Sequence, residues 1–147
     1  YGFGPSFHYK GFDFSFFFQG VAKTSLFMSG LQPFGTMMEN KNVQKFIADD
    51  RWSPENQNIF AEYPRLTIER SANNSTTSTY WERNGAFLKL KNAEIGYTFK
   101  SMRLYLRGSN LLTFSKFKLW DPEQGGGNGL KYPTQRVFNI GFQMTIK

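Results

Sequence analysis

The side chains that could support catalysis or bind a metal ion are few and scattered. His8 is the only histidine, and it lies on the polar side of an alternating segment, so a Ser–His–Asp site would depend on this one residue. Asp49, Asp50 and Glu55 could offer oxygen ligands to Ca²⁺, but they lack EF-hand spacing and equally suit turn capping. A phosphate-binding loop requires Lys-Ser or Lys-Thr after its glycine-rich run. Neither pair follows the glycine-rich run 125–129. The sequence therefore predicts neither an enzyme nor a protein that holds a metal or cofactor.

Five other side chains are suited to contacting a ligand rather than transforming one: Arg103, Arg107, Trp52, Trp81 and Trp120. The two arginines share one face of an alternating segment, where they would contact a ligand or an inserted domain, or pair with an acid such as Glu94. The three tryptophans lie in or beside long segments that do not alternate. Aromatic rings stack on sugars and peptides, but they also pack loops and line membrane interfaces. Both interpretations of these five residues stay open.

The composition indicates a sheet that faces lipid. Aromatic residues make up 18% of the 147 positions, 17 of them phenylalanine, although only 39% of the chain is hydrophobic. No apolar run approaches the roughly 20 residues that a membrane-spanning helix needs, whereas such a composition suits a β-sheet with one face in lipid. The absence of cysteine excludes disulfides and Cys-ligated metals. The net charge of +7 is scattered along the alternating segments outside residues 23–83, so we predict no nucleic-acid partner.

Alternation of apolar and polar residues predicts five antiparallel strands, near residues 2–10, 12–22, 86–99, 102–110 and 135–147. The last of these runs for about ten residues, the length that crosses a bilayer at a tilt. Nine side chains of matching parity are expected to face lipid: Phe12, Phe14, Phe16, Phe18, Phe138, Ile140, Phe142, Met144 and Ile146. The apolar parity inverts between Leu90 and Ala93, which predicts a β-bulge between Lys91 and Ala93.

The connections between these strands differ in length in a regular way. Two-residue turns are predicted at 10–11 and 100–101, whereas the loops near 23–83 and 111–135 are long. All short links then fall at one end of the sheet and all long links at the other. Short periplasmic turns and long extracellular loops are typical of outer-membrane barrels, and compact soluble domains seldom contain such long loops. The chain starts at Tyr1 without a targeting segment, so we expect a piece of a longer protein.

Several motifs, in this order and spacing, resemble one known family: residues 50–56 (DRWSPEN), 63–65 (YPR), 81–92 (WERNGAFLKLKN), 96–98 (GYT), 108–114 (GSNLLTF), 121–123 (DPE) and 132–133 (YP). Together with the final alternating strand they are similar to the SusC/RagA-type TonB-linked outer-membrane transporters of Bacteroidetes. The resemblance covers roughly residues 50–147, and residues 1–22 fit the preceding hairpin. Two features depart from the family: the chain ends on Ile146-Lys147 instead of an aromatic residue, and the turn at 100–101 is shorter than usual.

The resemblance implies an all-β fold, in which this chain supplies the carboxy-terminal five strands of a transmembrane barrel of about 22 strands with a plugged lumen. It also implies location in the cell outer membrane, energy supplied through TonB, and a SusD-like surface lipoprotein as partner. The implied cargo is an oligosaccharide or a peptide too large for porins. Five strands alone cannot close a barrel. Two alternatives stay open, a soluble carbohydrate-binding β-sandwich module and an outer-membrane barrel enzyme, although the second would have to rely on His8.

Overall fold

The computed structural model describes residues 1–29, 43–67 and 71–146. The chain divides into two compact units. The sheet unit comprises Tyr1–Leu26, Arg83–Gly125 and Gly129–Lys147, and the loop unit comprises Phe27–Glu82 and Gly126–Asn128. Residues 30–42 and 68–70 of the predicted loop 23–83 lie outside the described residues.

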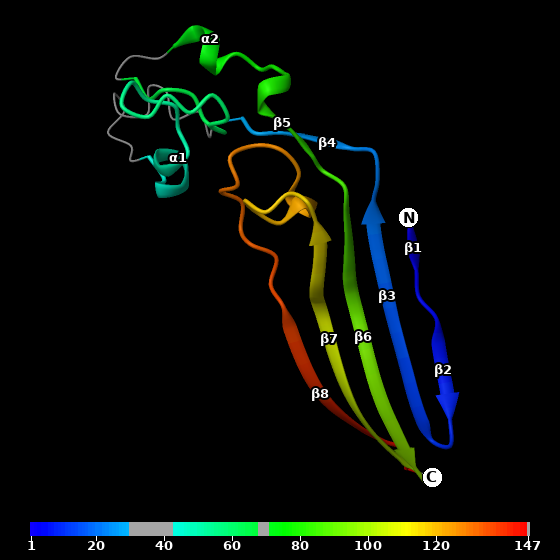
Figure 1. The fold of residues 1–147 in the computed structure, drawn as a ribbon. Coiled ribbons are helices and arrows are strands. Elements are labelled where there is room, and N and C mark those ends of the chain that lie inside the picture. The colour runs from blue at the N-terminus through cyan, green and yellow to red at the C-terminus, as the bar shows by residue number, and fades with distance from the viewer. Residues whose placement is uncertain (30–42, 68–70, 147) are drawn as a thin grey trace. The chain divides into compact units, whose positions relative to one another are not determined.

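Six strands build one sheet in the sheet unit: β1 (Gly2–Phe3), β2 (Ser6–Tyr9), β3 (Phe12–Val21), β6 (Phe87–Phe99), β7 (Met102–Ser115) and β8 (Val137–Met144). Both β1 and β2 pair with β3, and β6, β7 and β8 follow in chain order. Every pair is antiparallel, which confirms the predicted up-and-down pairing. Figure 1 shows the 10–11 and 100–101 turns at the same end of the sheet, beside the C-terminus.

Shorter elements complete the described residues: β4 (Ser25–Phe27), β5 (Glu82–Asn84), α1 (Lys45–Asp49), α2 (Ala72–Ser75), and the 3₁₀ helices η1 (Thr79–Trp81) and η2 (Pro122–Gln124). Strands β4 and β5 form a separate two-stranded sheet. No helix in the described part of the chain is both long enough and apolar enough to cross a membrane.

The strand bounds differ from the sequence prediction in two instructive places. The first predicted strand is split into β1 and β2 around Pro5, because proline has no N–H to donate to a sheet. Strand β7 runs five residues beyond the predicted end at Asn110, and its pairing with β6 continues to Ser115 opposite Phe87. Asn110 has a positive φ of 54°, and the polar run 108–110 (GSN) interrupts the apolar alternation there, which hides this continuation in the sequence.

The predicted β-bulge is present, one residue earlier than expected. The register between β6 and β7 shifts between Leu90 and Asn92, where Lys91 on β6 stands opposite two residues of β7. The register between β3 and β6 shifts at the same level, between Phe17 and Phe18. The irregularity therefore crosses three adjacent strands, which is why the parity of the apolar residues inverts along β6.

The pairing register assembles the expected apolar face. One row across four strands contains Phe12, Tyr97, Leu104 and Phe142, and the next contains Phe14, Ile95, Leu106 and Ile140. Most of these side chains are exposed, Phe142 at 62% and Ile140 at 79% of their surface. Phe16 and Phe18 are instead half-buried, because their rings pack edge-to-face at 5.7 Å and Phe3 stacks on Phe18 at 5.2 Å. Ile146 lies beyond the end of β8.

None of the buried hydrophobic side chains in the described residues belongs to these two rows. In the sheet unit they are Leu26, Phe87 and Phe117, and in the loop unit they are Met28, Ile47, Tyr63 and Trp81. A soluble β-sandwich buries the apolar side of each sheet against a second sheet. Among the described residues, no second sheet of comparable size exists to bury it.

The loop unit brings together two motifs that are separated in sequence. The amide N–H of Trp52 donates to the carbonyl of Tyr63 at 2.9 Å, and the N–H of Tyr63 donates to the carbonyl of Asp50 at 3.0 Å. Residues 50–56 and 63–65, both noted in the sequence, thus lie side by side. The ring of Phe46 in α1 packs edge-to-face on Tyr63 at 5.9 Å between centroids.

Candidate functional site

The polar face of the sheet carries an ion-pair network centred on Arg103 of β7. Its Nε donates to Asp13 Oδ1 of β3 at 3.0 Å, its Nη2 also reaches Asp13 Oδ2, and the same Nη2 donates to Glu94 Oε1 of β6 at 2.6 Å. One guanidinium therefore links three neighbouring strands. Glu94 is the acid that the sequence suggested as a partner for the two arginines, whereas Asp13, 90 residues away in the chain, was not anticipated.

Gly96 makes this bridge possible. It stands between Asp13 on β3 and Tyr105 on β7 in the register. A Cβ atom at Gly96 would lie 2.6 Å from Arg103 Nη2 and 2.7 Å from each carboxylate oxygen of Asp13. Only a residue without a side chain leaves room for the guanidinium to cross β6 and reach β3.

The ring of Tyr105 occupies the space that a side chain at Gly141 of β8 would fill. A Cβ at Gly141 of β8 would lie 2.1 Å from the Cζ atom of Tyr105, so the tyrosine ring lies directly over the glycine. The Arg103 guanidinium also lies 4.9 Å from the centroid of this ring, within the range of a cation–π contact. The side chains of Arg103 and Tyr105 thus form a continuous polar and aromatic layer over β6, β7 and β8.

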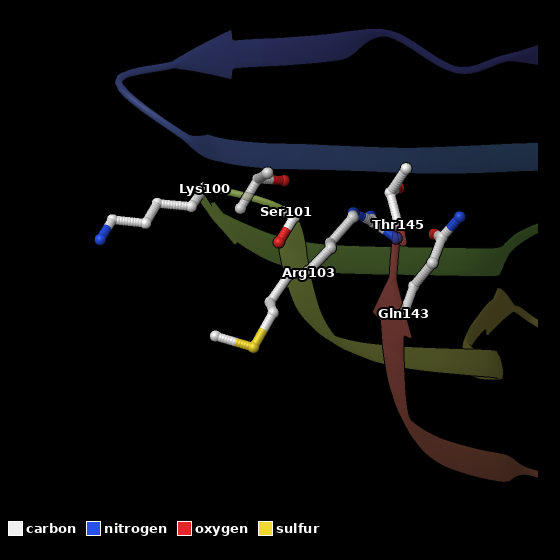
Figure 2. Close-up of a pocket in the computed structure, with 7 residues that line it drawn as sticks. Lys100, Ser101, Arg103, Gln143 and Thr145 are labelled. Atoms are coloured by element: carbon white, nitrogen blue, oxygen red, sulfur yellow. The ribbon is translucent and has the colours of Figure 1, made fainter. Parts of the chain in front are cut away.

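A hollow of about 550 Å³ opens beside this layer at the short-turn end of the sheet, lined by Thr98, Lys100, Ser101, Met102, Arg103, Gln143 and Thr145. Figure 2 shows Arg103 and Thr145 approaching each other, whereas Lys100 points away. Among the described residues, the lining offers hydroxyl, carboxamide, ammonium and guanidinium groups but neither a histidine nor a carboxylate. Such a surface can hold a polar chain by hydrogen bonds.

Arg107 stands on the same face one register row beyond Tyr105 and two beyond Arg103, opposite Glu94 on β6 and Asn139 on β8. Its side chain is exposed, and within the described residues it makes no hydrogen bond or ion pair. Arg103 and Arg107 therefore differ: the first is fully engaged in the sheet, whereas the second has its donors available.

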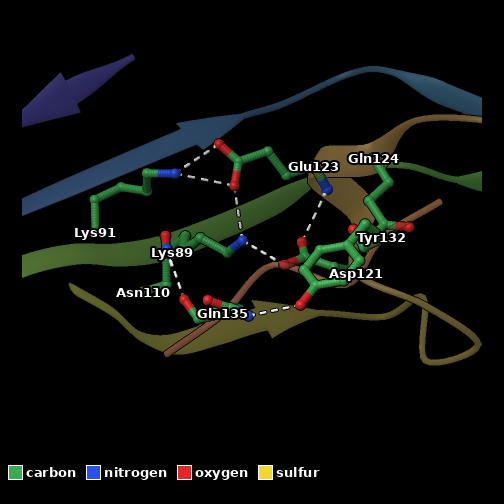
Figure 3. Close-up of polar contacts among 8 residues, drawn as sticks. All are labelled: Lys89, Lys91, Asn110, Asp121, Glu123, Gln124, Tyr132 and Gln135. Atoms are coloured by element: carbon green, nitrogen blue, oxygen red, sulfur yellow. Dashed lines mark hydrogen bonds and ion pairs between the residues drawn. The ribbon is translucent and has the colours of Figure 1, made fainter. Parts of the chain in front are cut away.

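A second ion-pair cluster lies at the other end of β6 (Figure 3). The Nζ of Lys89 contacts Asp121 Oδ2 at 2.5 Å and Glu123 Oε2 at 2.7 Å, and Lys91 Nζ contacts Glu123 Oε1 at 2.8 Å. Lys89 is only 1% exposed, which a lysine tolerates only when it is paired. The cluster fastens η2, in the segment between β7 and β8, to strand β6.

The two acids of this cluster are held in their charged form. Burial raises the pKa of Asp121. The hydrogen bonds that its carboxylate accepts from Lys89 and from the backbone N–H of Glu123 have a larger effect, so the pKa lies below its usual value. Burial likewise raises the pKa of Glu123, and hydrogen bonds from Lys89 and Lys91 reverse the shift. Both carboxylates are therefore ionised at neutral pH, and each contributes to stability in that form.

The three candidate tryptophans are not brought together in one site. Trp120, in the sheet unit, donates from Nε1 to the carbonyl of Gly125 at 2.9 Å and packs edge-to-face on Phe117. Trp81, in the loop unit, is 2% exposed and donates from Nε1 to the carbonyl of Asn74 at 2.9 Å. Trp52 is half-buried in the same unit. The side chains of Trp81 and Trp120 thus take part in packing their own segments.

The sequence reasoning missed Lys89, Asp121, Glu123, Gly96 and Tyr105. The Asp121-Pro122-Glu123 run was noted only as a family motif, and nothing marked Lys89 as its partner 32 residues away. The sequence did contain one signal. Lys89 lies between Leu88 and Leu90, on the polar face of β6, and a lysine buried there would need an acidic partner.

Comparison with known proteins agrees with this geometry. No family model matches the chain. TonB-dependent receptor P26 of Formosa agariphila is 30% identical over 99% of the chain and 17% of the relative. TonB-dependent receptor SusC of Bacteroides thetaiotaomicron is 26% identical over 92% of the chain and 14% of the relative. Along nearly its whole length the chain is therefore similar to TonB-dependent receptors, SusC among them.

Two solved structures share the fold of this chain. The RagAB peptide transporter superposes with a TM-score of 0.75 at 24% identity, over 97% of this chain and 17% of that one. The RagAB peptide importer in its closed-closed state gives a TM-score of 0.74 at 23% identity. The chain spans about one sixth of the length of the receptors it matches. The six-stranded sheet thus matches one part of a larger fold in the solved structures.

Proposed function

We propose that this chain forms part of the wall and outer loops of an outer-membrane TonB-dependent transporter that imports a bulky nutrient. The observation that carries the proposal is the continuous apolar face of β3, β6, β7 and β8, which stays exposed in the described residues. Such a face is stable only against lipid, and strands of 8 to 14 residues suit a tilted crossing of the bilayer. The opposite, polar face lines the lumen.

The sidedness follows from the connections. The two short turns lie with the C-terminus at one end of the sheet, which is the periplasmic end in outer-membrane barrels. The long connections then face the outside of the cell, with loop 23–83 as the main contact for a SusD-like surface lipoprotein. The chain supplies the carboxy-terminal strands of a barrel of about 22 strands, whose lumen is plugged by a domain elsewhere in the protein.

The two arginines on the lumen face have different roles. Arg103 is committed to Asp13 and Glu94, so its role is to fix β3, β6 and β7 in register. Arg107 has uncommitted donors and faces the lumen, where it contacts the plug or the passing cargo. A cargo too large for porins, an oligosaccharide or a peptide, would meet hydrogen-bonding groups along this face and no catalytic residue.

Transport is tested by uptake of labelled oligosaccharides and peptides into cells that express the full-length receptor. We expect uptake of at least one of these cargo classes to fall about tenfold or more when TonB or the partner lipoprotein is deleted, since each is required for energised import. The amount of folded receptor in the outer membrane should not change. Uptake that persists unchanged without TonB would contradict the proposal, and so would failure of the receptor to fractionate with the outer membrane.

A further inference from the structure

A smaller hollow of about 270 Å³ lies entirely within the loop unit, lined by Pro64, Asn73, Asn74, Thr76, Ser78, Tyr80 and Trp81. Most of these residues come from α2, η1 and the short segment between them. None of the lining side chains in the described part of the chain is charged. The volume is just below the roughly 300–1,000 Å³ typical of pockets for drug-sized ligands, so the hollow suits a single ring.

The walls of the hollow are held in place by contacts that leave other groups available. Trp81 is anchored through its Nε1 to the carbonyl of Asn74, and the hydroxyl of Tyr80 donates to the carbonyl of Glu62 at 2.7 Å. The rings of Tyr80 and Trp81 are perpendicular, with centroids 5.0 Å apart. These contacts fix the shape of the hollow before any ligand enters, which reduces the entropic cost of binding.

Three polar groups in the lining are available to bind a ligand. Within the described residues, the carboxamides of Asn73 and Asn74 and the hydroxyl of Ser78 make no hydrogen bond. The ring of Tyr80 is 44% exposed beside them. The hollow thus offers donors, acceptors and an aromatic surface at once, without a charge to select an ion.

We propose that this hollow binds one neutral sugar ring of the imported cargo, an inference that rests on the proposed transport function. Carboxamides and hydroxyls both donate and accept, as the hydroxyl groups of a sugar do, and an aromatic ring covers the apolar face of a pyranose. A peptide is recognised instead through its backbone along a strand edge, or through charged groups at its termini and side chains. The hollow offers neither, so the chemistry of the lining favours a neutral oligosaccharide.

The test uses the purified full-length receptor and a panel of neutral oligosaccharides, with neutral peptides as a second panel, measured by isothermal titration calorimetry. The double variant Asn73→Ala/Ser78→Ala removes two uncommitted groups without touching the contacts that hold Tyr80 and Trp81. We expect it to weaken binding of the responsive oligosaccharide about tenfold, since two hydrogen bonds are lost. Tyr80→Leu, which removes the ring, should weaken binding further.

Gln57→Ala is the matched control, because Gln57 is an exposed amide of the same unit that lies outside the hollow. It should bind like the wild type, and all variants should show the wild-type shift in heat-modifiable gel mobility. The inference is wrong if no neutral oligosaccharide binds, if the double variant binds as tightly as the wild type, or if neutral peptides are the ligands that the variants weaken. Because TonB-dependent uptake is measured separately, these results would leave the proposed transport function standing.

Discussion

Replacing Phe142 by arginine is expected to destabilise the folded receptor by about 2 kcal/mol, because a cation on the lipid face of a barrel costs roughly 2–4 kcal/mol at the bilayer midplane and less towards the interfaces. Phe142 lies on the apolar face one register row from the short-turn end, opposite Leu104 on β7, and is 62% exposed. No acid stands beside it on that face to offset an introduced charge. The measurement is reversible urea unfolding in lipid vesicles, together with heat-modifiable gel mobility of membranes from expressing cells.

Two controls separate lipid exposure from loss of packing. Phe142→Leu keeps the site apolar and should change the free energy of unfolding by less than about 1.5 kcal/mol. Ser15→Arg places the same charge on the polar face, beside Glu94 on β6, where it meets an acid instead of lipid. If Phe142→Arg unfolds like Phe142→Leu, the apolar face does not contact lipid.

The Lys89→Met variant is expected to lose about 3 kcal/mol, close to the lower end of the range for breaking a buried ion pair. Lys89 is 1% exposed, and without its ammonium group Asp121 and Glu123 would face each other as partly buried carboxylates. The value lies low in the range because these two acids keep 19% and 29% of their surface exposed. Urea unfolding of the full-length receptor measures the loss, and faster proteolysis within residues 116–135 should accompany it.

The triple variant Lys89→Met/Asp121→Asn/Glu123→Gln is the control, since it removes the cation and both anions together. It should recover much of the lost stability, because no uncompensated charge is left buried. In the wild type, the lowered pKa values of Asp121 and Glu123 mean that their contribution is complete above about pH 5 and is lost as the pH falls below about 4. If Lys89→Met is proteolysed at the wild-type rate, or if this pH dependence survives in the triple variant, the cluster does not fasten the segment.

The strands of this chain could be predicted from the sequence because their signal is local. Alternation of Phe138, Ile140 and Phe142 with polar residues specifies both the strand and the face that each residue occupies. The inverted parity between Leu90 and Ala93 even located the bulge to within one residue. The extension of β7 was missed because residues 108–110 (GSN) interrupt the apolar alternation and Asn110 adopts a positive φ, although Leu112 and Phe114 resume the alternation at the same parity.

The polar contacts could not be predicted, since they depend on which residues the register places side by side. Arg103 reaches Asp13 across the intervening strand β6 only because Gly96 lacks a side chain. No local sequence pattern indicates that Gly96 lies between these two residues. Lys89 and Asp121 likewise meet only when the segment after β7 folds back on β6. The role of Trp81 was ambiguous in sequence for the same reason, because its burial depends on a hydrogen bond to Asn74.

Spin labels placed one at a time along β8 test most directly that this sheet is the lipid-facing wall of a barrel. The chain has no cysteine of its own, so single cysteines can be introduced at 138, 140 and 142 on one face and at 139 and 143 on the other. Gly141 is left unchanged because Tyr105 covers it. In the full-length receptor in vesicles, labels at 138, 140 and 142 should collide with lipid-dissolved oxygen, and labels at 139 and 143 should not. Equal access to oxygen at both parities, or access of a water-soluble nickel chelate at position 140, would contradict the account.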